Sequence, residues 1–272
     1  MRMDKSQSRD MNDKLILITG GSSGIGKAAA IELHNQGAKI ILQARDIGKL
    51  KSTATEIDSS GNRISYYSTD LTDQASVEIA AKNICENEGL PDVVINSAGA
   101  GEWLSFSEAD LSHYKNTMDS PYLATAFTCK VFFDKMQKRG SGHFIIINSA
   151  ACYFSFPGAT GYIPARWAMR GFARSFQADV YDTDFTVSMI ALGKVQSPYF
   201  ENNPISEERI PKIANWLIPT MSVETAGEII SKNVRSKRSI VIKPFMMSFL
   251  VLFNRFIPGV FRWLMRITSS RN

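Results

Sequence analysis

Short runs of apolar residues recur along the chain at intervals that fit strands alternating with helices. Strands are expected where these runs lie, at residues 15–19, 39–43, 64–67, 93–96, 144–148, 186–192 and 239–242. Stretches between them, such as 24–36 and 76–87, have the composition of helices. Alternation of this kind builds a parallel sheet with helices on both faces. The pattern therefore predicts an α/β fold, a doubly wound parallel sheet of about seven strands.

The pattern changes in three regions. Residues 1–12 are polar and contain no apolar core, so we expect a disordered leader and no secretory signal. Several prolines interrupt the alternation in residues 199–222, which we expect to pass over the carboxyl edge of the sheet on the substrate side. Residues 13–244 would otherwise form one domain, followed by a tail at 245–272. The longest apolar run of the tail, 245–253, is shorter than the roughly 20 residues that a membrane-spanning helix needs.

The tail is both apolar and basic. The 272-residue chain has a net charge of +5, and no acidic residue follows Glu228, whereas nine basic residues do. Because this charge is mixed with Phe, Met, Leu and Trp, it favours contact with a membrane surface over binding of nucleic acid. Pro258 and Gly259 would divide the tail into two short amphipathic helices. An apolar segment folded over the substrate cleft, or buried in a dimer interface, explains the pattern equally well.

Composition excludes several classes of protein. Hydrophobic residues make up 44% of the chain and charged residues 21%, which excludes a wholly disordered or collagen-like chain. Three cysteines without paired spacing and three dispersed histidines argue against a disulfide scaffold and against a metal site. We expect a cytoplasmic protein, associated with membranes if the tail docks on lipid.

A glycine-rich turn directly follows the first expected strand. Its residues are Gly20, Gly21, Ser22, Ser23, Gly24, Ile25 and Gly26. Gly20 permits a sharp turn, Gly24 lets a pyrophosphate approach the backbone, and Gly26 lets the next helix pack close to the strand. The free N–H groups and the positive end of that helix would face the phosphates. The turn predicts a dinucleotide-binding site.

The end of the second expected strand indicates which dinucleotide binds. Sites that prefer NAD usually carry an acidic residue here for the ribose 2′-hydroxyl, whereas an arginine can pair with a 2′-phosphate. This chain has Arg45 at that position, and Lys49 follows one helical turn later. The sequence therefore favours NADP(H) over NAD(H).

Further motifs follow later strands: Ser-Thr-Asp70-Leu71 after the third and Asn96-Ser-Ala98-Gly99 at the fourth. With the glycine turn, they make residues 13–200 resemble the short-chain dehydrogenase/reductase family of the classical type, with its Rossmann-like fold. The resemblance implies that several residues contact the cofactor. They are Asp70 and Leu71, beside the adenine, and Asn96, Ala98, Gly99 and Val195. The segment from Asn96 to Gly99 would also support the central sheet. For Asn96, a strand-stabilising amide without a catalytic role is the alternative.

The same resemblance places a catalytic pair at Ser149 and Tyr162, which are 13 residues apart, as the family's pattern expects. Reduction of a carbonyl needs hydride from a nicotinamide and a proton at the oxygen. A phenol supplies that proton well near pH 7 only if a nearby cation favours its deprotonated form. A hydroxyl such as that of Ser149 can hold the substrate oxygen and stabilise the developing alkoxide.

Of the positions that depart from the family's pattern, two fall in the expected catalytic site. The lysine expected four residues after the tyrosine is Arg166, and an asparagine expected in the preceding helical segment is Asp119. Arg166 keeps the positive charge and can hydrogen-bond the nicotinamide ribose, but a guanidinium cannot relay a proton, so we expect slower turnover or altered cofactor geometry. We further expect Asp119 to pair with Arg166, directly or through one water, and to support it.

Within the family, the glycine turn, Arg45 with Lys49, and Ala168-Met-Arg-Gly171 are similar to 3-ketosphinganine reductases. The expected activity is NADP(H)-dependent interconversion of a ketone and a secondary alcohol on an apolar, lipid-like carbonyl substrate. Family habit implies a homo-oligomer. Two other functions stay open: a catalytically impaired nucleotide-binding sensor, and a membrane-surface scaffold on the same fold.

Overall fold

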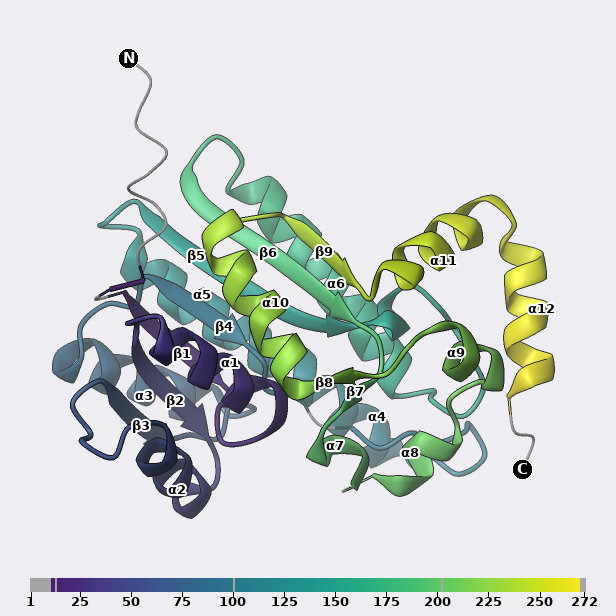
Figure 1. Cartoon of the computed structure of the whole chain (residues 1–272), viewed down its shortest axis with the longest axis horizontal. Helices are drawn as coiled ribbons and strands as arrows, with labels where there is room; N and C mark the ends of the chain where they lie inside the picture. The colour runs from purple at the N-terminus through teal and green to yellow at the C-terminus, as the bar shows by residue number, and fades with distance from the viewer. Residues whose placement is uncertain (1–10, 13, 100, 202, 270–272) are drawn as a thin grey trace.

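The core of the molecule is one seven-stranded sheet in which all strands are parallel (Figure 1). The computed structural model describes residues 11–12, 14–99, 101–201 and 203–269. The strand order is β3-β2-β1-β4-β5-β6-β9. Successive strands are added on one side of β1 as far as β3 and on its other side from β4 onward, and this change of side leaves a crevice at the carboxyl ends of β1 and β4. The strands are β1 Leu15–Thr19, β2 Lys39–Ala44, β3 Ile64–Ser68, β4 Val93–Asn96, β5 Ser141–Ser149, β6 Asp184–Leu192 and β9 Ile240–Lys243.

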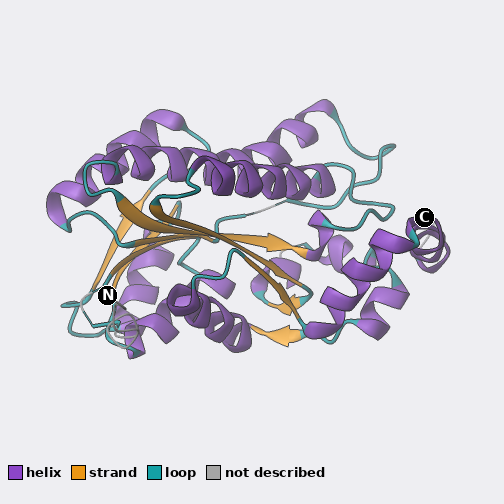
Figure 2. Cartoon of the chain, turned by 90° about the horizontal axis from the view of Figure 1, so that it is seen from above, coloured by secondary structure: helices purple, strands orange, loops and turns teal. Residues whose placement is uncertain are grey.

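Helices cover both faces of the sheet (Figure 2). The helices of these two layers are α1 Gly24–Asn35, α2 Ile47–Ile57, α3 Gln74–Asn87, α4 Leu111–Met118, α5 Ala124–Met136, α6 Tyr162–Asp179 and α10 Val223–Ser236. Successive strand residues point to opposite faces of the sheet. Leu17 therefore packs in one core cluster with α3, α5 and α6, whereas Ile16 and Ile18 pack in a second cluster with α1, α2 and α10. The prediction of a doubly wound α/β fold is confirmed.

All seven expected strands are present, with small changes at their ends. β5 begins at Ser141, earlier than its apolar run, because Ser141 and Gly142 pair with the start of β6. The expectation of a disordered leader over residues 1–12 needs correction at its end. Met11 is buried in the core cluster around α1, and its carbonyl accepts a hydrogen bond from the Lys14 amide. The packed domain therefore includes Met11, and residues 1–10 lie outside the described residues.

The proline-rich region forms three short helices and a small second sheet at the carboxyl edge. The helices are α7 Pro198–Glu201, α8 Pro204–Glu208 and α9 Lys212–Leu217. Pro198 and Pro204 begin helices, where a missing N–H costs little. The strands β7 Val195–Gln196 and β8 Met221–Ser222 pair in parallel at the two ends of the region. Because β7 pairs with β8, the two ends of the proline-rich region lie side by side.

The tail forms two helices, α11 Phe245–Phe256 and α12 Pro258–Thr268, which differ in direction by 119°. In the described part of the chain no single helix is long and apolar enough to cross a membrane, and the two tail helices meet the criteria of length and composition only as a bent pair. Met247 and Leu250 of α11 and Phe261 and Met265 of α12 are buried against the domain. The tail is therefore packed on the substrate side through one face of each helix.

The buried His143 of β5 makes the stability of the fold depend on pH. Its Nε2 lies 2.9 Å from Ser188 Oγ, and burial lowers the pKa of the imidazole from 6.5 to about 3. The unfolded chain takes up a proton at His143 below pH 6.5, whereas the folded chain does so only near pH 3. Folding stability is therefore lost as the pH falls through this window.

We expect His143 to remove about 2 kcal/mol of unfolding free energy between pH 7.5 and pH 5. Urea denaturation at several pH values would measure the loss. The His143→Gln variant should lack this contribution and show a shallower dependence. Equal pH dependence in the two proteins would contradict the assignment.

Candidate active site

A cavity of about 590 Å³ opens at the carboxyl ends of the central strands. It brings together residues from the glycine turn, from the ends of β2 to β6 and from the proline-rich region. Of the residues singled out in the sequence, those that line it are Gly20, Ser22, Ser23, Gly24, Ile25, Gly26, Arg45, Lys49, Asp70, Leu71, Ala98, Gly99, Ser149, Tyr162, Arg166 and Val195. Asn96 and Asp119 are not among its lining residues.

The glycine turn is shaped by close backbone contacts. Gly20 and Gly24 have φ of +66° and +52°, which favour glycine. A Cβ on Gly20 would also lie 2.8 Å from the Ala98 amide nitrogen, and one on Gly26 would lie 2.3 Å from the Gly20 carbonyl oxygen. Thr19 Oγ1 accepts hydrogen bonds of 3.2 Å from the amides of Ser97 and Ala98. These contacts hold the ends of β1 and β4 together under the turn.

Helix α1 begins at this turn with its amino end unprotected. Ser23 occupies the N-cap position but makes no side-chain capping hydrogen bond, and the first turn contains no acidic residue. In contrast, α2, α3 and α10 are each capped by a side-chain oxygen, from Asp46, Asp73 and Ser222. The first N–H groups of α1 and the positive end of its dipole are therefore available to an anion in the cavity.

Two exposed cations lie at the end of β2. Arg45 follows the strand and Lys49 lies in the first turn of α2, and both line the cavity. Asp46 lies between them, but its carboxylate accepts a 3.0 Å hydrogen bond from the Lys49 amide as the cap of α2. Asp70 lies near Arg45 and accepts hydrogen bonds from the hydroxyl and the amide of Thr72; these bonds, with the Arg45 charge, lower the pKa of its carboxyl. This end of the cavity therefore holds two cationic side chains, Arg45 and Lys49, beside the carboxylates of Asp46 and Asp70.

The opposite wall carries Ser149 and Tyr162. Ser149 ends β5, and its Oγ accepts a 3.2 Å hydrogen bond from the Ala151 amide, which leaves its own proton free to be donated. Tyr162 is the first residue of α6 and is mostly buried, and none of the described residues forms a hydrogen bond with its hydroxyl. Pro164 lies in the first turn of α6, where proline is tolerated.

Arg166 lies one turn after Tyr162 on α6, with its Cζ 4.8 Å from the centre of the tyrosine ring. The residue is only 8% exposed, and its Nε has no hydrogen-bond partner among the described residues. Its Nη1 lies 3.6 Å from the sulfur of Met169, and no carboxylate of the described chain forms an ion pair with the guanidinium. Gly99 leaves room for it, because a Cβ there would lie 3.0 Å from Nη2. A nearly buried cation without an anion therefore faces the cavity.

The expected direct pair between Asp119 and Arg166 is wrong. The Asp119 carboxylate forms an ion pair with Lys115, one turn earlier at the end of α4. The backbone turns away at the next residue, because Pro121 disfavours helical torsions in the residue before it and Ser120 has φ −131° and ψ 111°. Ser120 lines the cavity in place of Asp119.

The structure shows Asn96 in one of the two roles that the resemblance implied, support of the sheet, and outside the lining of the cavity. Its side-chain amide is buried and donates to the sulfur of Cys129 at 3.3 Å and to the carbonyl oxygen of Ile145 at 3.5 Å. The side chain thus joins β4 to α5 and β5. Its place in the structure is support of the sheet rather than contact with the cavity.

Two aromatic residues beside Tyr162 had no signal in the sequence. The Trp103 ring lies 5.1 Å and the Tyr199 ring 6.3 Å from the ring of Tyr162, centre to centre. Trp103 Nε1 donates to the Tyr199 hydroxyl, which itself donates to the Gly101 carbonyl. Burial raises the pKa of Tyr199, so this phenol keeps its proton. Residue 103 lies in the loop after β4 and residue 199 in helix α7, 96 positions later, so no local spacing could have paired them.

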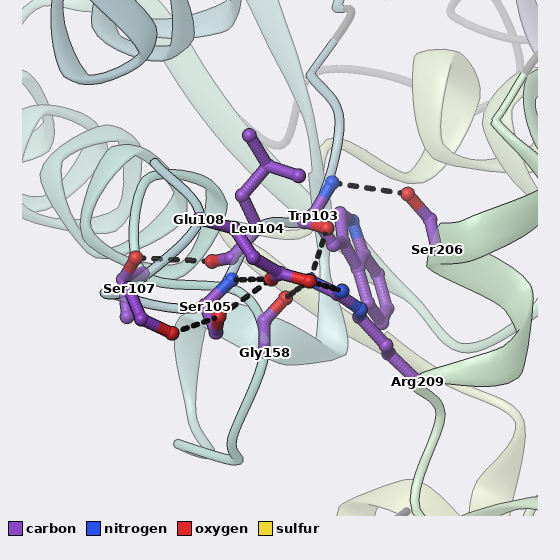
Figure 3. Close-up of polar contacts among 9 residues, drawn as sticks. Trp103, Leu104, Ser105, Ser107, Glu108, Gly158, Ser206 and Arg209 are labelled. Carbon is purple, nitrogen blue, oxygen red and sulfur yellow. Dashed lines mark hydrogen bonds and ion pairs between the residues drawn. The ribbon is translucent and has the colours of Figure 1, made fainter. Parts of the chain in front are cut away.

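Figure 3 shows a polar cluster that ties the proline-rich region to the loop around Trp103. The Arg209 guanidinium donates to the Trp103 carbonyl at 2.7 Å and to the Gly158 carbonyl at 3.3 Å, and forms an ion pair with Glu108. The Trp103 amide donates to Ser206 Oγ at 3.1 Å. Hydrogen bonds from Arg209 and Ser105 hold the pKa of Glu108 at about 2, so the ion pair persists in mild acid.

Comparison with known proteins identifies the family. The sequence profile described as short chain dehydrogenase matches residues 14–208. The chain belongs to the short-chain dehydrogenase family. It is 27% identical over 228 residues to 3-dehydrosphinganine reductase of Danio rerio, an alignment that covers 82% of this chain and 69% of the relative. The distant similarity to 3-ketosphinganine reductases, named for the same ketone, is therefore confirmed.

Solved structures share the fold of this short-chain dehydrogenase. A short chain dehydrogenase/reductase from Burkholderia phymatum in complex with NAD has a TM-score of 0.80 at 18% identity, covering 97% of this chain and 99% of that one. An alcohol dehydrogenase from Thermococcus sibiricus complexed with 5-hydroxy-NADP has a TM-score of 0.73 at 24% identity, covering 85% and 95%. Membership makes this protein an NAD(P)-dependent oxidoreductase.

The residues present fit such a coenzyme. The glycine turn and the uncapped start of α1 suit a pyrophosphate, and the Nε of Arg166, which has no partner among the residues that the structure describes, suits a polar group of a bound coenzyme. Among the described residues, no group of His, Cys, Asp and Glu side chains is arranged to hold a metal ion.

We expect Arg209→Ala to destabilise the substrate side of the cavity. The variant loses hydrogen bonds from a charged donor to two carbonyls, a cost of about 1.5–3 kcal/mol, or roughly 5 °C in Tm. Calorimetry would measure the shift, and limited proteolysis should cut the proline-rich region faster. Lys212→Ala, an exposed change on α9, is the control. Equal melting of the two variants would show that the cluster of Figure 3 does not hold the region.

Proposed function

We propose that this enzyme uses NADP(H) to interconvert a ketone and a secondary alcohol on an apolar, lipid-like substrate. The observation that carries the proposal is that Ser149, Tyr162 and Arg166 line the same cavity as the glycine turn. The Tyr162 phenol, the Ser149 hydroxyl and the buried guanidinium of Arg166 therefore lie in one cavity.

Each of the three side chains would have a distinct role in reduction. The bound nicotinamide coenzyme supplies the hydride. The Tyr162 hydroxyl, which has no partner in the described chain, donates the proton to the carbonyl oxygen. The guanidinium of Arg166, 4.8 Å from the ring, stabilises the phenolate that remains and binds the ribose. Ser149 donates a hydrogen bond to the substrate oxygen while its own Oγ is held by the Ala151 amide.

The lining of the cavity supports an apolar substrate. On the substrate side it is formed largely by aromatic and aliphatic side chains, which are Trp103, Phe154, Phe156, Ile210, Ile218, Leu250 and Met265. Such a surface gains free energy from apolar groups of the substrate and offers few partners for a polar one. The name of the Danio rerio relative, 3-dehydrosphinganine reductase, adds support for a long-chain ketone.

The preference for NADP(H) is supported by Arg45 and Lys49. Both are exposed at the adenosine end of the cavity, and the neighbouring Asp46 is occupied in capping α2. A 2′-phosphate can accept charge-assisted hydrogen bonds from Arg45, whereas a 2′-hydroxyl gains little from it.

A nucleotide sensor without turnover is the second candidate. It is favoured by one observation: Asp119 pairs with Lys115, so the segment that departs from the family's pattern does not support Arg166 directly. A sensor would bind NADPH and leave it unoxidised with every ketone offered.

We expect Tyr162→Phe to lower turnover by about 100-fold or more, because general acid catalysis of this kind contributes that much. Oxidation of NADPH would be followed by absorbance with a series of ketones of increasing chain length. Binding of NADPH, measured by fluorescence, should change little. Tyr181→Phe, an exposed tyrosine outside the cavity, is the control.

Arg166→Lys separates the two candidate functions. A reductase should keep its turnover or gain some, because the compact ammonium retains the charge. Turnover that survives in Tyr162→Phe would refute the assignment of the acid. Tight NADPH binding without oxidation in the wild type and in Arg166→Lys would instead establish the sensor.

We expect Arg45→Ala to raise the KM for NADPH about 10-fold or more, through the loss of a charge-assisted contact of about 1.5–3 kcal/mol. The KM for NADH should stay nearly constant. Lys51→Ala on α2 is the matched control, because Lys51 is exposed and lies outside the cavity lining. A wild-type enzyme that prefers NADH would contradict the proposal.

A further inference from the structure

The two tail helices expose an apolar surface that nothing in the described chain covers. Phe245 is 78% exposed, Phe256 73% and Trp263 58%. We call this the tail surface, and its side chains are Phe245, Phe249, Leu252, Phe256, Ile257, Val260, Trp263 and Ile267. On α11 they recur at helical spacing, and Phe256, Ile257 and Val260 continue the surface around the bend. Large exposed apolar surfaces usually mark sites of interaction.

The tail surface is held in place by packing on its inner side. The ring of Phe261 stacks on Phe154 at 4.7 Å, and the Asn254 side chain donates to the Tyr153 carbonyl at 3.3 Å. Helix α12 also packs on α9, beside the exposed Trp216. In Figure 1 both tail helices lie at one end of the molecule, beyond the carboxyl edge of the sheet. The two tail helices are thus fixed on the domain by their inner faces, and the tail surface points away from the domain.

Charge indicates what covers the tail surface. Arg255, Arg262 and Arg266 are exposed on the same two helices, and none of them forms an ion pair within the described residues. The chain has no acidic residue after Glu228, so the charged side chains of the tail itself are all basic. A second copy of the chain would bring the same positive charges together, whereas an anionic surface would neutralise them. Apolar side chains mixed with arginine match the boundary between headgroups and acyl chains.

We propose that the tail surface docks on the surface of a bilayer that contains anionic lipid. The helices lie in the interface with their exposed aromatic side chains among the upper acyl groups and their arginines at the headgroups. Neither helix alone is long and apolar enough to span the bilayer, and the two differ in direction by 119°.

The docked position would also place an apolar groove next to the lipid. A second cavity of about 180 Å³ lies between α9, α11 and α12, and its lining side chains are Ile213, Leu217, Met246, Phe249, Leu250, Phe253, Phe261, Leu264 and Met265. Leu250 and Met265 line the catalytic cavity as well. An acyl chain could therefore pass from the bilayer toward Tyr162 along apolar side chains. This passage rests on the proposed function, whereas the docking does not.

The test is flotation of the full-length protein with unilamellar vesicles of phosphatidylcholine, with and without phosphatidylglycerol. The variant Phe245→Ser/Phe256→Ser/Trp263→Ser removes exposed side chains that contribute to neither cavity. Its control is Ile79→Ser/Leu111→Ser/Tyr181→Ser, which removes three exposed apolar side chains elsewhere. A third variant, Arg255→Gln/Arg262→Gln/Arg266→Gln, tests the charge.

We expect the wild type and the control to float with anionic vesicles, and the apolar variant to stay in solution. The arginine variant should bind about 100-fold more weakly, because each cation near an anionic surface contributes roughly fivefold. NADPH oxidation with a short, water-soluble ketone should be equal in all four proteins, which shows that the variants are folded and tests the proposed function separately.

Three results would overturn the docking proposal. The first is a wild type that does not float with anionic vesicles, and the second is an apolar variant that floats as well as the control. The third is a wild-type dimer, measured by light scattering, that the apolar variant converts to a monomer without any vesicle binding, since the tail surface would then be an interface between copies.

Discussion

The site depends on the close approach of backbones where β1 and β4 end side by side. Gly20 lies against the Ala98 amide, and Gly26 lies against the Gly20 carbonyl. Thr19 Oγ1 accepts hydrogen bonds from two backbone amides just after β4. A side chain at either glycine would push α1 away from the sheet. Because these contacts hold α1 with its bare amino end toward the crevice, an anion can be bound by backbone N–H groups without any basic side chain.

A second constraint is the buried guanidinium of Arg166. It fits because Gly99 has no side chain: a Cβ there would lie 3.0 Å from Nη2. The described chain gives it no carboxylate, so its charge acts on whatever occupies the cavity. An arginine in this position retains the electrostatic effect of a lysine while its hydrogen bonding becomes planar and directional. Binding and positioning are therefore retained more readily than proton relay.

The two halves of the cavity are built in different ways. The nucleotide half consists of strand ends and the turn that follows β1, which the sheet positions rigidly. The substrate half consists of the proline-rich helices and the tail, held by Arg209 with its carbonyl partners and by the packing of Phe261 on Phe154. Substitutions in the nucleotide half would disrupt the sheet, whereas the sequence of the substrate half can change to suit a different substrate without disrupting it. This division explains why family and coenzyme class follow from comparison while the substrate is inferred from the lining.

The strands, the glycine turn and the spacing of Ser149 and Tyr162 could be predicted from the sequence, because each depends on residues close together in the chain. Local pattern also marked the tail as amphipathic, but left open whether it packs or stays exposed. Only the tertiary structure decided that each tail helix does both. It likewise decided that Asp119 pairs with Lys115, that Asn96 lies outside the lining of the cavity, and that the loop at Trp103 contacts Tyr199 and Arg209. Those contacts join residues up to about a hundred positions apart, where side-chain direction depends on how whole elements pack, and local periodicity carries no information about that packing.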